Sequence, residues 1–196
     1  MMSVVQFICS ICRCLWRCLV VGFCGSRSLS SSFAPLVARA VAASPGRFVA
    51  VGCASGADRF ARSAAGARAR VFRASSFVRP GVPFAGALAA RSSAFVRAVA
   101  ASPSPLLVAF VSAPCPAGLV PSPSPSRCFR GLGSGSWASL ALAVGLGVPV
   151  VVFPCPLAGA LLPGWWGSWS PAAGALGRLG GLSLAFSRPV QPLLFS

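Results

Sequence analysis

Lysine, glutamate, histidine, tyrosine, asparagine and threonine are all missing from this chain of 196 residues, and Asp58 is its one acidic residue. Their absence excludes paired carboxylates, a Ser-His-Asp triad, a Walker lysine and zinc sites that use histidine. Only Asp58, arginine, serine and cysteine remain for catalysis, so we expect a binding protein and assign no catalytic residue. Because all of the missing residues need adenine in their codons, we infer a coding strand depleted in adenine.

The net charge of +16 comes entirely from arginine. A positive field of this size attracts polyanions such as nucleic acid or anionic lipid. The arginine excess has an alternative origin in codon bias, but the physical charge exists either way. Binding to nucleic acid is therefore expected to be sensitive to salt.

Hydrophobic residues make up 56% of the chain, which is a membrane-like share. However, the longest apolar stretch, residues 4–23, carries Arg13 and Arg17 near its middle. Each would cost about 2.5–3.5 kcal/mol at the centre of a bilayer. We predict a soluble, cytoplasmic protein, with membrane association through residues 4–23 as the alternative.

Nine cysteines are present, and Cys9, Cys12, Cys14 and Cys18 have a C-x2-C-x-C-x3-C spacing. Four thiolates at such spacing could hold zinc, but structural zinc sites usually take ligand pairs from separate turns. We favour unpaired thiols and assign no metal and no cofactor. Cys53 is a conceivable nucleophile, since its place near a helix N-terminus would lower the thiol pKa.

Apolar runs alternate with helical segments from residue 18 onward, whereas residues 1–17 form a cysteine-rich hydrophobic lead. We expect strands at 18–24, 48–52, 70–74, 106–111 and 148–153, and helices at 33–43, 58–67, 84–101 and 136–146. In the helix 58–67, Arg59 and Arg62 are placed on the exposed side. Residues 112–130 read as a Pro/Ser-rich loop too poor in apolar residues to enter the core. Residues 157–196, rich in Gly, Pro and Trp, form either a packing tail or a disordered segment.

This alternation predicts an α/β fold for residues 18–156. The expected architecture is a Rossmann-like three-layer sandwich with about five parallel strands in the order 3-2-1-4-5. Ligands of such sheets bind at the carboxyl ends of the strands. Three loops of small residues follow strands there, at 25–27, 52–58 and 131–136.

The three loops, in this order, resemble the DprA/Smf-like and LOG-like Rossmann proteins of the SLOG superfamily. Gly-Ser-Arg-Ser at 25–28 is similar to the family's first loop, Gly-Cys-Ala-Ser-Gly-Ala-Asp at 52–58 to its G-x-A-x-G-x-D motif, and Ser-Gly-Ser at 134–136 to its S-G-S/T turn. Arg91 stands where the family has an Arg-Asn pair, although Ser92 replaces the Asn. Ser139 occupies the position of the catalytic Glu of LOG enzymes.

The resemblance implies a ligand site at these loops. Its candidate residues are Gly25, Ser26, Arg27, Gly52, Ser55, Gly56, Asp58, Arg91, Gly133, Ser134, Gly135 and Ser136. Asp58 could contact a ligand or orient its loop, or it could simply be a carboxylate favoured in the first turn of a helix. Arg27 and Arg91 are either phosphate clamps or solvated charges. Trp137 and the tryptophans at 165–169 could stack bases, but packing is the favoured role.

The first hypothesis is non-catalytic binding of a nucleotide, a nucleotide-derived ligand or single-stranded DNA or RNA, by a protein that could form a homodimer. The second is a nucleotide N-glycosidase that uses Asp58 to assist water. The third is a membrane-associated protein, or the product of an adenine-poor frame that is not a genuine gene.

Overall fold

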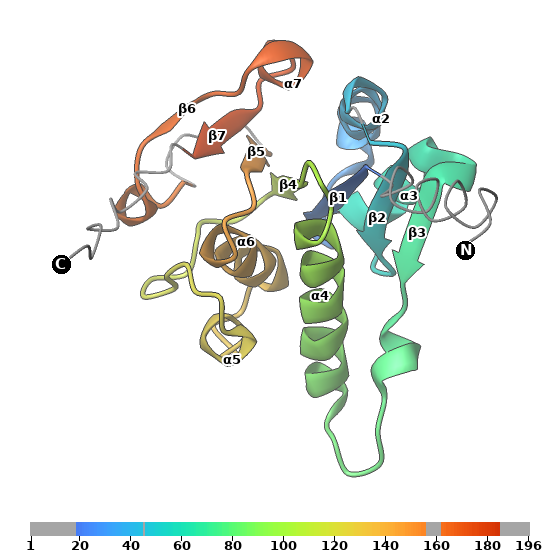
Figure 1. Ribbon diagram of the computed structural model, residues 1–196, viewed down its shortest axis with the longest axis vertical. Coiled ribbons are helices and arrows are strands. Elements are labelled where there is room, and N and C mark those ends of the chain that lie inside the picture. Colours follow the sequence, from blue (N-terminus) through green and yellow to red (C-terminus); the bar gives the residue numbers. More distant parts are fainter. Residues whose placement is uncertain (1–18, 45, 156–161, 185–196) are drawn as a thin grey trace, which may run out of the picture.

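The computed structural model of the protein describes residues 19–44, 46–155 and 162–184. Seven strands in this part of the chain form one sheet with helices on both faces (Figure 1). The strands are β1 (Val20–Gly25), β2 (Phe48–Gly52), β3 (Ala69–Phe72), β4 (Leu106–Val111), β5 (Val150–Pro154), β6 (Trp169–Pro171) and β7 (Leu182–Leu184). The α-helices are α2 (Ala34–Ala43), α3 (Ala57–Ala65), α4 (Phe84–Ala100), α5 (Pro125–Cys128), α6 (Gly135–Gly145) and α7 (Gly174–Arg178). Short 3-10 turns are η1 (Ser31–Phe33), η2 (Gly66–Arg68), η3 (Ala74–Phe77) and η5 (Gly164–Trp166).

The five strands expected from the sequence are parallel and lie in the order β3-β2-β1-β4-β5, which confirms the predicted Rossmann-like fold class. The central strand β1 pairs with β2 on one side and with β4 on the other, so that Val21 lies opposite both Val49 and Leu106. The middle of the sheet is apolar on both faces, because every residue of β5 and all but the first residue of β4 are buried. Burial on both faces is what near-continuous apolar strands require.

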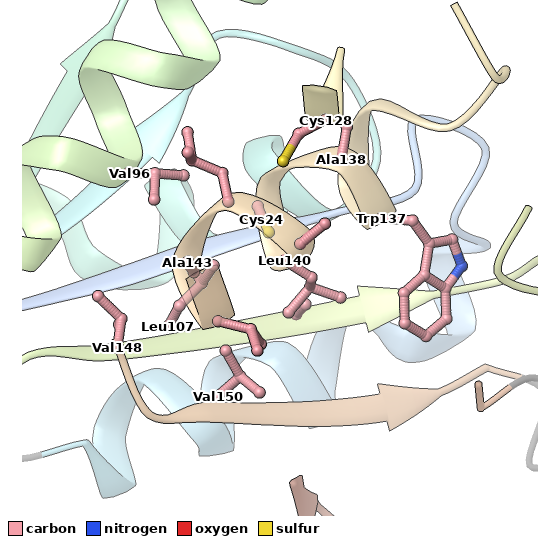
Figure 2. Close-up of a cluster of buried hydrophobic side chains, with 14 of the residues drawn as sticks. Cys24, Val96, Leu107, Cys128, Trp137, Ala138, Leu140, Ala143, Val148 and Val150 are labelled. Carbon is pink, nitrogen blue, oxygen red and sulfur yellow. The ribbon is translucent and has the colours of Figure 1, made fainter. Parts of the chain in front are cut away.

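Alternate side chains of the strands supply two separate hydrophobic layers. Leu107 and Ala109 of β4 pack in the layer beneath α4 and α6, whereas Val108 and Phe110 face the layer of α2, α3 and α7. Figure 2 shows part of the first layer, in which Leu140 of α6 lies over the strands. Each fully buried Leu or Phe contributes about 1.5–3 kcal/mol. The two layers therefore stabilise the strands whose carboxyl ends lead into the loops.

The segment 112–130 departs from the sequence prediction, which kept it out of the core. Leu119 and Cys128 are each only 1% exposed, and both belong to the layer beneath α4 and α6. The loop lies directly on α6, where the N–H of Ser122 donates to the carbonyl of Ala141. Gly145 permits this approach, because a side chain there would collide with the backbone of Ser122. A few well-placed apolar residues suffice to bury a loop that is mostly Pro and Ser.

The C-terminal segment extends the sheet beyond the five predicted strands. Strand β7 pairs antiparallel with β5, and β6 pairs antiparallel with β7 at the edge of the sheet. The sequence contains no regular period here, since each strand is only three residues long and Pro171 lies in the edge strand β6. Trp166 packs edge-to-face on the buried Trp137, and the Nε1–H groups of Trp165 and Trp166 donate to the carbonyl of Leu119. Trp137 and Trp166 thus serve packing, the role favoured from the sequence.

None of the helices in the described ranges is both long and apolar enough to cross a bilayer. Residues 1–18, with the four cysteines of the proposed zinc spacing and most of the apolar stretch 4–23, lie outside those ranges. Within the described part, Cys24, Cys53, Cys115, Cys128 and Cys155 are free thiols, and no group of three or more metal-ligating side chains occurs.

Candidate functional site

A cleft of about 580 Å³ lies at the carboxyl ends of the parallel strands. Its walls come from the loops after β1, β2 and β4, from the first half of α4 and from the start of α6. Nine of the twelve candidate residues line the cleft, and Asp58 is the one candidate among them from the second loop: Gly25, Ser26, Arg27, Asp58, Arg91, Gly133, Ser134, Gly135 and Ser136. Gly52, Ser55 and Gly56 are absent from this lining. The three predicted loops therefore meet at one place, but only Ala54 and Asp58 of the second loop line the cleft.

The first loop is fixed to the end of β4. Ser26 donates its N–H to the carbonyl of Phe110 at 2.8 Å, and its Oγ accepts hydrogen bonds from the N–H and the Oγ of Ser112 at 3.0 and 2.6 Å. Gly25 has no room for a side chain, because a Cβ there would meet the backbone of Phe110 and the methyl of Ala57. These contacts hold the exposed Arg27 at the rim of the cleft.

The second loop supports the first loop from behind. Gly56 has φ +61° and lies against the carbonyl groups of Ser26 and Arg27, where any Cβ would collide. The N–H of Ala57 donates to the carbonyl of Ser26 at 3.1 Å, and the Oγ of Ser55 donates to the carbonyl of Arg27 at 3.2 Å. The glycine and serine of this motif are therefore engaged in contacts within the protein.

Asp58 and Arg91 form a buried ion pair on the floor of the cleft. The Nη1 of Arg91 lies 3.4 Å from the Oδ2 of Asp58, and the two residues are 9% and 4% exposed. The N–H of Ala54 also donates to this oxygen, at 3.2 Å. Gly52 lies directly beneath the pair, since a Cβ there would collide with both side chains. Of the two roles weighed for Arg91, that of a solvated surface charge is wrong.

Burial raises the pKa of Asp58 above 3.8, and the nearby guanidinium of Arg91 opposes this rise. The Nε of Arg91 is buried and has no hydrogen-bond partner among the described residues. An unsatisfied buried donor costs about 1–3 kcal/mol, so the pair is incomplete as it stands.

Arg62 is a further residue of this region. It is half-buried, so the prediction that it lies on the exposed side of its helix is wrong. Its Nη1 donates to the carbonyls of Gly52 and Ala54 at 2.9 and 3.1 Å. Arg62 therefore closes the second loop, and its charge lowers the pKa of Asp58 to a small extent. The available signal was the spacing Asp58–Arg62, because residues four apart share one face of a helix.

The third loop leads into the N-terminus of α6, which opens on the cleft. The Oγ of Ser134 accepts a hydrogen bond from the N–H of Trp137 at 3.3 Å and so caps the helix. Gly133 has φ +96°, and a Cβ added at Gly133 or Gly135 would have no neighbour within 4 Å outside the adjacent chain. The first turn of a helix carries free N–H groups and a partial positive charge. This end of α6 is suited to bind an anion.

Part of the wall of the cleft is apolar and was not predicted. Leu88 of α4 contributes to it, together with Leu119, Phe129 and Leu132 from the segment 112–132. Leu132 is 41% exposed. No motif marks Leu119, Phe129 or Leu132, since they come from a segment with no regular period. The cleft thus combines loop backbone and polar side chains with aliphatic and aromatic groups.

The thiols around the cleft are poor nucleophiles. Cys24 and Cys128 line it, and burial raises the pKa of both thiols. Cys53, considered above as a nucleophile, is absent from the lining, and its Sγ accepts a hydrogen bond from the N–H of Ala74 at 3.3 Å. Ser139, at the position of the LOG glutamate, is buried and donates its Oγ–H to the carbonyl of Gly135.

Comparisons with known proteins leave the family unassigned. No protein-family model and no curated protein matches the sequence. Among solved structures, the fold is similar to that of DNA processing protein A from Helicobacter pylori, a protein that binds single-stranded DNA. The two are 20% identical with a TM-score of 0.46, over 69% of this chain and 65% of that chain. Membership of the SLOG superfamily stays a prediction from the motifs.

Proposed function

We propose that the cleft binds the phosphate of a nucleotide, a nucleotide-derived ligand or single-stranded nucleic acid, without catalysis. The observation that carries this proposal is the N-terminus of α6, which opens into the cleft that Arg27 also lines. Free N–H groups at a helix start and a guanidinium at a loop tip are complementary to phosphate. The other site residues from the sequence motifs position these two groups.

The charge of the cleft supports an anionic ligand. Its lining holds two arginines and one carboxylate, and Arg91 is paired with Asp58. The charge of Arg27 and the partial charge of the α6 dipole are therefore uncompensated.

The dimensions and the apolar wall support a ligand with a flat apolar part beside its phosphate. A volume of about 580 Å³ falls within the range of small-molecule sites. Phe129 and Leu88 offer surface against which a nucleobase could pack. A phosphate at α6 and a base on this wall would use both kinds of surface in the cleft.

The N-glycosidase hypothesis requires Asp58 to assist a water molecule. Its carboxylate already accepts hydrogen bonds from Ala54 and Arg91, and Ser139 offers no second carboxylate. We therefore expect no release of base when the protein is incubated with a nucleoside monophosphate. If the wild type released the base and the variant Asp58→Asn did not, the protein would be an N-glycosidase that uses Asp58.

A pair of arginine substitutions tests the binding proposal. Arg27→Ala should weaken nucleoside monophosphate binding by about 1.5–3 kcal/mol, as expected for hydrogen bonds to a charged group. The matched control is Arg178→Ala on α7, an exposed arginine outside the cleft lining. The measurement is a titration with a nucleoside monophosphate and with a short single strand at two salt concentrations. Equal, small losses in both variants would leave only a basic surface, and the proposal would fail.

A further inference from the structure

The turn between η3 and α4 displays apolar side chains to solvent. Val78, Val82 and Phe84 are 56%, 46% and 61% exposed. Residues 78–84, here called the tip, project from the body of the molecule at the far end of α4 (Figure 1). The other large apolar side chains that are exposed in the described ranges, Leu19, Val120, Leu132 and Trp165, come from separate segments. A concentration of apolar groups at a projecting tip is typical of an interaction site.

The tip is a defined turn. The N–H of Val82 donates to the carbonyl of Arg79 at 3.2 Å, and the N–H of Gly86 donates to the carbonyl of Pro83 at 2.8 Å. Gly81 has φ +73°, a conformation that glycine adopts without strain. Pro80 and Pro83 further restrict the backbone on either side. The chain is therefore held with its apolar side chains facing outward.

The charge around the tip indicates an anionic partner. Arg79 belongs to the tip and Arg73 precedes it, and both arginines are exposed. The chain has a single acidic side chain, Asp58, and that residue is buried. A second copy of the protein therefore has no acidic side chain on its described surface to offer to these arginines. The partner must supply the negative charge.

We propose that the tip docks on an anionic lipid bilayer. Val78, Val82 and Phe84 would enter the boundary between head groups and acyl chains, with Arg79 and Arg73 at the lipid phosphates. Such peripheral binding combines buried apolar area with attraction to anionic lipid. Single-stranded nucleic acid is less suited, because it would engage the arginines but offers aliphatic valines no stacking partner.

The test is flotation of the full chain with vesicles made of phosphatidylcholine and phosphatidylglycerol in equal parts. The double variant Val78→Ser/Phe84→Ser should reduce the partition coefficient by at least about tenfold, since apolar burial is lost. Val120→Ser, which removes an exposed valine elsewhere, is the matched control for the single variant Val78→Ser and should bind as the wild type does, whereas Val78→Ser should bind more weakly. Arg79→Ser should reduce binding about fivefold, and its control Arg178→Ser should have a smaller effect.

Comparison between variants is essential, because residues 4–23 are present in every one of them and could bind lipid themselves. Equal partition of wild type and tip variant would overturn the proposal. The proposal would also be overturned if the tip variant changed the oligomeric state of the protein, as measured by sedimentation, and left vesicle binding unchanged. The partner of the tip would then be a second copy of the chain. A loss of oligonucleotide binding with unchanged vesicle binding would assign the tip to nucleic acid instead. Retention on pure phosphatidylcholine vesicles should be weak for all variants.

Discussion

Loops 52–58 and 131–136 are both rich in glycine and serine and both lead into a helix, yet they use their backbone in opposite ways. In the first, Ala54 and Ala57 donate their N–H groups within the protein, and Arg62 binds the carbonyls. In the second, Gly133 and Gly135 have open space around them and border the cleft. A glycine can thus allow close approach to the chain itself or leave room for a ligand, and composition does not distinguish the two.

The largest expected effect comes from the ion pair beneath loop 52–58. Arg91→Leu would leave Asp58 buried without its partner and should lower the free energy of unfolding by about 3–5 kcal/mol. Chemical denaturation at neutral pH measures this. The double variant Asp58→Asn/Arg91→Leu is the control, because it removes both charges and should recover much of the loss. A single variant as stable as the wild type would show that the pair does not hold this loop.

Matched alanine substitutions sharpen the comparison of the two loops. Gly52→Ala places a methyl against Arg91 and Asp58 and should cost about 1–3 kcal/mol of stability, as for overpacking. Gly135→Ala has open space and should change stability by less than about 0.5 kcal/mol.

Gly135→Ala should nevertheless weaken phosphate binding, since its methyl enters the cleft, whereas Gly164→Ala, also in open space, should not. Denaturation and phosphate titration of the three variants check this. Unchanged binding in Gly135→Ala would contradict an anion site at α6.

The smallest effect expected is on the pH dependence of stability. No histidine or glutamate is present, so Asp58 carries the one side-chain carboxyl group that can titrate between acid and neutral pH. Its folded-state pKa is raised, which means that its contribution to stability is fully present below about pH 3.8 and is lost as the pH rises through the folded-state pKa. The wild type should therefore lose stability relative to Asp58→Asn as the pH rises from 4 to 7. Thermal unfolding of both proteins across this range gives the sign, and an opposite slope would mean that Arg91 dominates over burial.

The central part of the fold could be predicted because its signals are local. The runs at 48–52 and 106–111 are continuous apolar segments bounded by Gly and Pro, and the strands have the same limits. Strands β6 and β7 could not be found, since three residues give no period and their pairing depends on β5, far away in the sequence.

The candidate site was predictable to the extent that its loops follow parallel strands. The carboxyl ends of such strands meet at one edge, so the convergence of Gly25, Asp58 and Gly135 on one cleft followed from topology. The pairing of Asp58 with Arg91 did not, because it joins residues 33 positions apart on different helices. The apolar wall of Leu119 and Phe129 depends on how a Pro-rich loop folds onto α6, which no local pattern encodes.

A crystal structure of the full chain with a bound nucleoside monophosphate tests the central claim most directly. The account predicts phosphate density at the N-terminus of α6, within hydrogen-bond distance of the backbone N–H groups of residues 134–136 and of the Arg27 guanidinium. It also predicts that the base lies toward Phe129 and Leu88. Density for the nucleotide only at exposed arginines outside the cleft, with the start of α6 open to solvent, would contradict it.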